Sequence, residues 1–334
     1  MIRQGHIFIK AAPLLRRNFS AQKSKMHSIA ASFKPDSSGT SPKQLDYIPS
    51  LKLNDGYEIP MLAYGLGTAR SRGEAEDTKR LTVMAIKHGY YHLDGAQSYK
   101  NEAELGAAIK EAGVDRCKLF VTTKLQNMNM DVAASFAASL AALDLDYVDL
   151  YLIHAPFSAS SPEHLQKTWA ALEAIQASGR ARSIGVSNFS VADLKTVLET
   201  ARVKPVANQI EYHPYLQHES DGLLPFCRTQ NIAVVAYGPL TAITRARPGP
   251  CDDVYAELAR KYGVPETDVA LRWCIDQGVV VVTTSASEER LQGYMTRVPA
   301  FKLTPKEIED IAAEGRKKNF RAFWKNRYAV DDWR

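Results

Sequence analysis

The chain has 334 residues, 45% of them hydrophobic, and carries a formal net charge of +5. This length suits one large α/β domain, and no apolar run approaches the roughly eighteen residues that a membrane-spanning helix needs. Four cysteines without a C-x-x-C pair predict neither a disulfide framework nor a metal site, and they suit a reducing compartment.

The N-terminal segment contains seven Lys or Arg before its first carboxylate, Asp36. Arg3, Lys10 and Arg17 are spaced by seven, which places them near one face of a helix. An Arg-bearing, Ser-containing and acid-free start is typical of a mitochondrial targeting peptide. The motif "RRNFSAQ" resembles a matrix-protease site with cleavage before Ser20. We therefore expect a mitochondrial protein; a disordered basic tail is the alternative.

This segment also accounts for the net charge. Removal of residues 1–19 takes away four positive charges and lowers the formal net charge from +5 to +1, so no basic patch predicts nucleic acid as a partner. A second start at Met26 would bypass the targeting peptide and give a cytoplasmic form. We expect residues 1–50 to be a targeting peptide and a disordered extension that folding does not need, and residues 51–334 to be the folded domain.

The folded part begins with a hairpin and continues as alternating strands and helices. "LKLNDGYEIP" predicts a hairpin with Asn54-Asp55-Gly56 at its turn, since glycine accepts the positive φ of such turns. Eight apolar runs of strand length follow, separated by helical patterns such as "DTKRLTVMAIKHG" and "VADLKTVLET". The expected strands are "MLAYGLG", "YYHLD", "LFVTTK", "VDLYLIH", "SIGVSN", "VANQIEY", "VVAYG" and "VVVVTTS".

Eight strand–helix units with short connections predict a parallel sheet that is buried on both faces. Eight strands close into a (β/α)8 TIM barrel, so we expect this α/β fold with an N-terminal β-hairpin. An open doubly wound sheet is the alternative. In a barrel the active site lies at the carboxyl ends of the strands.

Polar or aromatic side chains end six consecutive expected strands. Taken alone, a carboxylate such as Asp94 is more simply a cap or a solvated loop residue, a lysine can snorkel to solvent, and a histidine can be satisfied in the core. Six such strand ends on one face of the sheet instead predict a shared site. Its expected members are Asp94, Tyr99, Lys124, His154, Ser187, Asn188, Gln209 and Tyr237.

The motifs around these residues resemble those of the aldo-keto reductases. They are "DGAQSY", "VTTK", "LIHAP", "GVSNF", "NQIEYHP" and "AYGPL", in this order, and the resemblance covers residues 51 to about 315. It implies a (β/α)8 barrel that reduces aldehydes or ketones with NADPH and has no Rossmann domain. Carried over to this sequence, the catalytic tetrad is Asp94, Tyr99, Lys124 and His154.

The residue types of this tetrad suit carbonyl reduction. Hydride transfer to a carbonyl carbon leaves an alkoxide that needs a proton, and a free tyrosine, with a pKa of about 10, is a weak donor near neutrality. We expect Lys124 to lower the pKa of Tyr99, and Asp94 to keep the lysine charged. His154 would donate to the carbonyl oxygen and orient it. By family analogy, histidine at this position fits carbonyl reduction and glutamate fits double-bond reduction.

The resemblance also implies cofactor contacts at the strand ends and in the loops that follow them. Hydroxyl and amide groups suit the nicotinamide carboxamide, and a tyrosine suits stacking on the nicotinamide ring. These candidates are Thr68, Ser187, Asn188, Gln209, Tyr237 and Leu240.

After the last strand the family usually has a Lys-Ser pair and then an arginine, which together bind the 2′-phosphate. The motif "TTSASEER" keeps Ser285 and Arg290 but has Thr284 in place of the lysine. Because arginine binds phosphate bidentately, we expect Arg290 to select NADPH over NADH.

The substrate pocket shows its own departures from the family. "VTTSASEERL" and "NFRAFW" resemble the fungal conjugated polyketone reductases and ketopantoyl lactone (α-keto amide) reductases, which act on α-dicarbonyl compounds. Gln126 stands where the family commonly has a tryptophan, and Ala69 is small, so we expect a less aromatic pocket at these two points. Phe157, Phe323 and Trp324 would line it instead; plain packing on the barrel is the alternative for these aromatics.

Other classes of protein fit the sequence less well. "GLGTAR" starts like a dinucleotide fingerprint, but Arg70 occupies the third glycine position, and a lone G-x-G is a weak signal. The absence of any Tyr-x-x-x-Lys motif disfavours the short-chain reductases. A reductase of simple aldehydes or sugars and a non-catalytic barrel subunit remain alternatives. No exposed apolar seam stands out, so we expect a monomer whose partner is a small carbonyl substrate, with no contact to membrane or nucleic acid.

Overall fold

The computed structural model describes residues 48–67, 74–329 and 332. The expected targeting peptide, the start at Met26, the cofactor candidate Thr68 and the pocket residue Ala69 lie outside this part of the chain. Within it, none of the helices has the length and apolar character that crossing a membrane requires.

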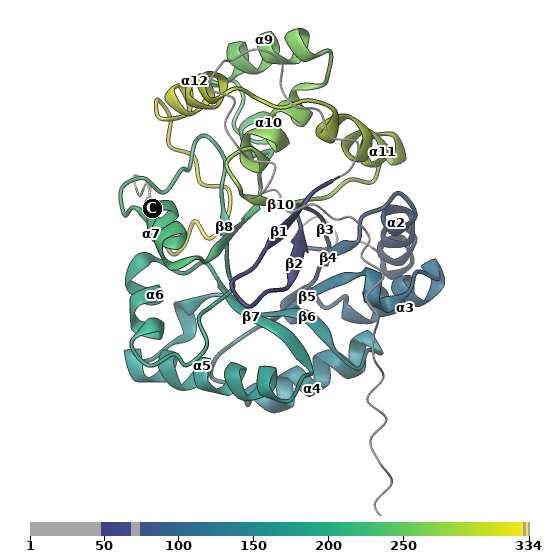
Figure 1. Ribbon diagram of the computed structural model, residues 1–334, viewed down its shortest axis with the longest axis vertical. Helices are drawn as coiled ribbons and strands as arrows, with labels where there is room; N and C mark the ends of the chain where they lie inside the picture. The colour runs from purple at the N-terminus through teal and green to yellow at the C-terminus, as the bar shows by residue number, and fades with distance from the viewer. Residues whose placement is uncertain (1–47, 68–73, 330–331, 333–334) are drawn as a thin grey trace, which may run out of the picture.

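A hairpin opens the described chain, as the sequence predicts. β1 (Ser50–Lys52) and β2 (Glu58–Pro60) pair antiparallel. Gly56 at the turn has a φ of +94°, a conformation that glycine adopts because it has no Cβ. Ile59 on β2 is completely buried. Figure 1 shows the hairpin lying across the middle of the ring formed by the other strands.

The turn of the hairpin is bonded to the barrel. The Asn54 side-chain amide donates to the carbonyl oxygens of Pro205 (2.9 Å) and Asn231 (3.0 Å). The Ser183 hydroxyl donates to the Asp55 carboxylate at 2.6 Å. Since these partners lie near the amino ends of their strands, the hairpin covers that end of the barrel and leaves the carboxyl end open.

Eight parallel strands close into a barrel in chain order, with the last strand hydrogen-bonded to the first. This closure confirms the (β/α)8 barrel and contradicts the open doubly wound sheet. The sequences of these strands are continuous apolar runs because nearly every strand residue is buried. The barrel strands are β3 (Leu62–Gly65), β4 (His92–Asp94), β5 (Phe120–Leu125), β6 (Val148–Ile153), β7 (Ala181–Ser187), β8 (Ala207–Glu211), β9 (Ala233–Tyr237) and β10 (Val280–Thr283).

Helices surround the barrel (Figure 1), and local signals set several of their ends. Ser190 and Asp193 form a capping box at the start of one helix, and Gly113 ends another in the left-handed conformation with a φ of +67°. The helices are α2 (Ala75–Lys87), α3 (Glu102–Ala112), α4 (Val132–Leu143), α5 (Pro162–Ala177), α6 (Val191–Leu198), α7 (Leu223–Gln230), α8 (Thr241–Thr244), α9 (Asp252–Tyr262), α10 (Glu266–Ile275), α11 (Glu288–Arg297) and α12 (Pro305–Gly315).

The chain after α12 returns to the carboxyl end of the barrel. We call residues 316–329 the C-terminal tail. The Phe320 N–H donates to the carbonyl of Tyr215 at 3.1 Å, and the next residues are bonded to the end of β8. The tail therefore lies against the end of the barrel where the expected site residues are found.

Candidate active site

A cavity of about 450 Å³ opens at the carboxyl end of the barrel. It brings together seven of the eight polar or aromatic residues that the strand-end pattern predicts; the eighth, Lys124, is completely buried beside them. The seven that line the cavity are Asp94, Tyr99, His154, Ser187, Asn188, Gln209 and Tyr237.

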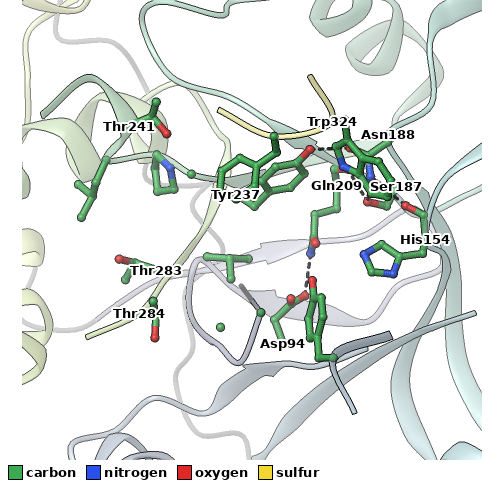
Figure 2. Close-up of a pocket in the computed structure, with 18 of the residues that line it drawn as sticks. Asp94, His154, Ser187, Asn188, Gln209, Tyr237, Thr241, Thr283, Thr284 and Trp324 are labelled. Carbon is green, nitrogen blue, oxygen red and sulfur yellow. Dashed lines mark hydrogen bonds between the residues drawn. The ribbon is translucent and has the colours of Figure 1, made fainter. Parts of the chain in front are cut away.

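The deepest part of the site is a buried ion pair. The Lys124 ammonium at the end of β5 donates to Asp94 Oδ1 at 2.6 Å and to the Gly95 carbonyl at 2.7 Å. The other oxygen, Asp94 Oδ2, accepts from Gln209 Nε2 at 2.7 Å (Figure 2). Burial by itself lowers the pKa of Lys124, but Asp94 and Tyr99 outweigh it and raise that pKa above its ordinary value. The lysine is therefore charged and held in place.

Tyr99 lies above this ion pair, on a 3-10 turn formed by Gln97–Tyr99. The Lys124 Nζ is 5.0 Å from the centre of its ring. A Cβ at Gly67 would lie 3.2 Å from the ring, so glycine lets the chain pass close to Tyr99 on its other side.

The ionisation of Tyr99 corrects one expectation. Burial raises the pKa of Tyr99 above its ordinary value, and Lys124 opposes this shift without reversing it. Lys124 thus acts in the predicted direction, but the pKa of Tyr99 does not fall below its ordinary value, because loss of solvent around the phenol outweighs the nearby positive charge. Tyr99 is a neutral phenol at neutral pH, which is the form that can donate a proton.

His154 stands at the end of β6, with its ring centre 5.5 Å from that of Tyr99. Its enclosed position and the charge of Lys124 lower its pKa to about 3, so the imidazole is neutral at neutral pH. The Ser98 hydroxyl lies 3.1 Å from Nδ1. We assign this hydroxyl as the donor and Nδ1 as the acceptor, which places the imidazole proton on Nε2.

A network of amides and hydroxyls forms one end of the cavity (Figure 2). Asn188, in the left-handed conformation with a φ of +61°, donates from Nδ2 to the His154 carbonyl at 2.9 Å and to Ser187 Oγ at 3.0 Å. The Tyr237 hydroxyl donates to Asn188 Oδ1 at 2.6 Å. These bonds hold the polar groups against the wall of the cavity and fix the position of the Tyr237 hydroxyl.

The opposite end of the cavity contains the hydroxyl groups of Thr283 at the end of β10, Thr284 directly after it and Thr241 at the start of α8 (Figure 2). Thr284 Oγ1 is buried and has no hydrogen-bond partner among the described residues. A buried polar atom without a partner at a cavity wall is a position where a bound molecule supplies the missing bond. Leu240 lines the same cavity, as the resemblance implies.

The expected phosphate-binding pair lies just beyond this end. Arg290 is exposed in the first turn of α11 and donates from Nε to Ser285 Oγ at 3.1 Å. Ser285 is buried, and neither residue lines the cavity itself. Together with Thr284 they form a hydroxyl and guanidinium cluster beside a helix N-terminus, which suits an anion.

The C-terminal tail supplies the aromatic side of the cavity. Phe323 and Trp324 line it, as predicted, whereas Phe157 contacts Trp324 with 5.0 Å between ring centres and lines a smaller neighbouring cavity of about 220 Å³. Gln126, which was expected to make the pocket less aromatic, does not line the larger cavity.

Two participants were not predicted. Ser98 contacts His154 although its only sequence signal is its place directly before Tyr99. Arg245 lines the cavity and lies 4.8 Å from the centre of the Phe323 ring, a contact across 78 residues that no local pattern indicates. Among the described residues, no group of three or more His, Cys, Asp or Glu is arranged to bind a metal.

Comparison with known proteins identifies relatives that are named as reductases. The model of the aldo/keto reductase family matches residues 62–314. The chain is similar to the NAD/NADP-dependent indole-3-acetaldehyde reductase of Schizosaccharomyces pombe, with 35% identity over 81% of this chain and 97% of the relative. It is also similar to the NADPH-dependent alpha-keto amide reductase of Saccharomyces cerevisiae, with 34% identity over 83% of this chain and 94% of the relative.

Solved structures give the same result. A Bombyx mori aldo-keto reductase in complex with NADP superposes with a TM-score of 0.73 and 35% sequence identity, over 80% of this chain and 92% of the other. A Brucella melitensis aldo/keto reductase superposes with a TM-score of 0.72 and 34% identity, over 80% of this chain and 99% of the other.

Proposed function

Because the chain belongs to the aldo/keto reductase family, we propose that it reduces α-dicarbonyl compounds to hydroxy carbonyl products, with NADPH as the hydride donor. It is an oxidoreductase of small carbonyl compounds. The observation that carries this function is the neutral Tyr99 phenol enclosed at the cavity wall, with a charged Lys124 beneath it.

The residues around the cavity fit the cofactor. Thr284 Oγ1 has no partner among the described residues, and Ser285 and Arg290 stand next to it for the 2′-phosphate. At the other end, Asn188 and Gln209 offer amides for the carboxamide, and Tyr237 offers a ring face. NADPH supplies a hydride for the carbonyl carbon when it is bound.

The chain's own residues supply the proton and hold the substrate. The carbonyl oxygen accepts hydrogen bonds from the Tyr99 hydroxyl and from His154 Nε2, which polarises the carbonyl and orients it. As charge develops on this oxygen, the proton moves from Tyr99 to it and the product alcohol forms. Lys124 stabilises the phenolate that remains, and Asp94 keeps Lys124 charged and prevents it from moving away.

The position of Trp324 and the names of two relatives support α-dicarbonyl compounds as the substrate class. A second carbonyl withdraws electrons from the first and makes its carbon more electrophilic, and its oxygen needs a donor of its own in an enclosed site. Trp324 carries an indole N–H and lies beside His154, with 6.2 Å between the ring centres. Relatives named for adjacent carbonyl groups include the yeast alpha-keto amide reductase and the Bacillus subtilis glyoxal reductase, the latter 37% identical over 72% of this chain.

A substrate panel with NADPH tests this assignment. Purified protein that begins at Ser20 or Met26 is assayed with α-keto lactones, α-keto amides, isatins, indole-3-acetaldehyde and simple aromatic aldehydes. We expect the highest kcat/KM values for the α-dicarbonyl members. A preference for simple aldehydes or sugars would contradict the substrate class and leave the carbonyl-reductase activity intact.

We also propose that Arg290 sets the preference for NADPH, since its guanidinium can bind the 2′-phosphate that NADH lacks. Arg290→Ala should raise KM for NADPH by about tenfold or more, as expected for loss of a charged hydrogen bond, and leave KM for NADH unchanged. Arg260→Ala, which removes an exposed arginine of α9, is the control. Equal efficiency of the unmutated enzyme with both cofactors would refute this role.

The compartment and the assembly state complete the proposal. The acid-free, Arg-bearing start of the sequence supports a mitochondrial product beginning near Ser20 and a cytoplasmic product from Met26. A monomer is supported separately, because the exposed large hydrophobic side chains among the described residues are only Tyr57, Tyr91 and Met130. N-terminal sequencing of the native protein separates these products. An intact Met1 on a wholly cytoplasmic pool would reject the targeting peptide.

A further inference from the structure

A buried carboxylate at the end of β8 binds the C-terminal tail. Glu211 is 1% exposed and follows Gln209 by two residues, so both side chains lie on the same face of the strand. Its Oε1 accepts the Ala322 N–H at 2.7 Å, and its Oε2 accepts the Phe323 N–H at 3.1 Å. One side chain therefore holds two consecutive peptide groups of the tail through charge-assisted hydrogen bonds.

Two histidines complete this arrangement. His213 is completely buried, and its Nε2 lies 3.0 Å from Glu211 Oε1. We assign Nε2 as the donor because a carboxylate oxygen can only accept. His218 Nε2 donates to the main-chain carbonyl of Glu211 at 2.7 Å. These bonds fix both the side chain and the main chain of Glu211. Glu211, His213 and His218 do not belong to the catalytic tetrad.

The peptide groups that Glu211 binds come directly before the aromatic residues of the cavity. The Phe323 and Tyr237 rings form a T-shaped pair with 5.3 Å between their centres. Trp324 contacts Phe157 and His154 and has a φ of +55°. A bulky residue adopts this left-handed conformation only when neighbouring contacts enforce it.

We propose that Glu211 is a positioning residue that holds Phe323 and Trp324 in place as the aromatic wall of the substrate pocket. This inference rests on the proposed reductase function, since the wall matters through the substrate that it contacts. A carboxylate is required because all three groups that point at it are donors: two peptide N–H groups and one imidazole N–H. An amide would turn a donor of its own toward one of them.

The test is Glu211→Gln. We expect KM for the α-dicarbonyl substrate to rise about tenfold or more, as follows from the loss of charge-assisted bonds. We expect kcat and the Kd for NADPH to change less than about twofold, because the side-chain partners of Glu211 are Ala322, Phe323 and His213, and the substitution removes no group that we assign to proton donation or to cofactor binding. Ala322→Pro removes one of the two N–H donors from the tail side, leaves the barrel untouched, and should raise KM in the same way.

A double-mutant cycle distinguishes positioning from a general loss of structure. In protein that already carries Phe323→Ala and Trp324→Ala, Glu211→Gln should change KM by less than about twofold, because the wall that it positions is gone. An undiminished effect of Glu211→Gln in that background would overturn the proposal.

Glu173→Gln is the matched control. Glu173 on α5 is also buried, and its Oε1 accepts two consecutive peptide N–H groups, from Arg202 at 2.7 Å and Val203 at 2.9 Å. This variant loses the same pair of peptide bonds to a carboxylate, together with an ion pair to Arg202 Nε at 3.2 Å, at a loop that does not belong to the cavity. We expect it to keep the KM of the unmutated enzyme.

Hydrogen exchange tests the contact between Glu211 and the tail without any need for activity. The Ala322 and Phe323 amides should be protected in the unmutated protein and in Glu173→Gln, and should exchange rapidly in Glu211→Gln. Retained protection in Glu211→Gln would overturn the proposal, and so would lost protection with an unchanged KM. An unmutated protein without reductase activity would reject the proposed function, while the exchange data would still show whether Glu211 binds the tail.

Discussion

His154 shows how one side chain acquires a defined chemical state from its surroundings. Its lowered pKa of about 3 keeps the ring neutral, and the Ser98 hydroxyl at Nδ1 leaves the proton on Nε2. A neutral imidazole has one donor, so its tautomer decides whether that donor can serve the substrate. Ser98 therefore supports the reaction although it does not bond to the reacting atoms itself.

Removal of this hydroxyl should weaken catalysis moderately. Ser98→Ala frees His154 to adopt the other tautomer, and we expect kcat/KM to fall about three- to tenfold, in line with one net hydrogen bond. Steady-state kinetics at saturating NADPH measure the change. Ser160→Ala is the matched control, since the Ser160 hydroxyl also lies 3.1 Å from a histidine Nδ1, that of His164, outside the cavity. An equal loss in both variants would contradict the role of Ser98.

The residue types and places of the site were predictable, but their energetics were not. Asp94, Lys124 and His154 each end an apolar run, and barrel closure brings such ends together. The net shift of the Tyr99 pKa depends on how much solvent the packed pocket removes, which no motif encodes. The bond from Gln209 to Asp94 spans 115 residues, so the sequence predicts that the two share a site but not that they contact each other.

At the scale of elements, the N-terminal hairpin covers the amino end of the barrel, and the C-terminal tail lies at the carboxyl end, beside the site. The hairpin was predicted because its turn carries a local glycine signal. The tail was predicted only to supply aromatics, because the bonds that fix it join Glu211 to residues more than a hundred positions away. Local chemistry is readable from a sequence, and long-range contacts of irregular segments are not.

A substitution in the hairpin should separate stability from activity. Ile59→Ala removes a completely buried side chain and should lower the free energy of unfolding by about 2–4 kcal/mol, the usual cost of such a cavity. We expect kcat/KM to stay within about twofold, since the hairpin covers the end away from the site. Urea unfolding and kinetics measure the two quantities.

Tyr57→Ala is the control for this prediction. Tyr57 belongs to the same hairpin but is 47% exposed, so its loss should change the unfolding free energy by less than about 0.5 kcal/mol. A large loss of kcat/KM in Ile59→Ala, at a temperature where the variant is fully folded, would mean that the hairpin affects the site.

At the scale of the whole molecule, buried histidines make stability depend on pH. Burial is the main cause that lowers the pKa of His92 and His218 to about 4 and that of His154 to about 3. Each folded-state pKa lies below the unfolded value of about 6.5. The stability that each neutral ring contributes is therefore fully present above pH 6.5 and is lost as the pH falls toward 4.

Urea unfolding at pH 7.5, 6.5 and 5.5 should show this loss. Each histidine contributes a slope of up to about 1.4 kcal/mol per pH unit below its unfolded pKa. His218→Asn should make the decline shallower, and asparagine tolerates the φ of +54° at this position. An unfolding free energy that is the same at pH 7.5 and pH 5.5 would contradict the burial of these rings as neutral groups.

The central claim is that Tyr99 is the proton donor for carbonyl reduction, and Tyr99→Phe tests it most directly. The measurement is the rate of NADPH oxidation with an α-keto lactone, together with the Kd for NADPH from fluorescence. We predict that kcat/KM falls about 10²- to 10⁴-fold, the range of a lost general acid, while the Kd stays within about twofold. Activity close to that of the unmutated enzyme, with NADPH bound equally well, would contradict the claim.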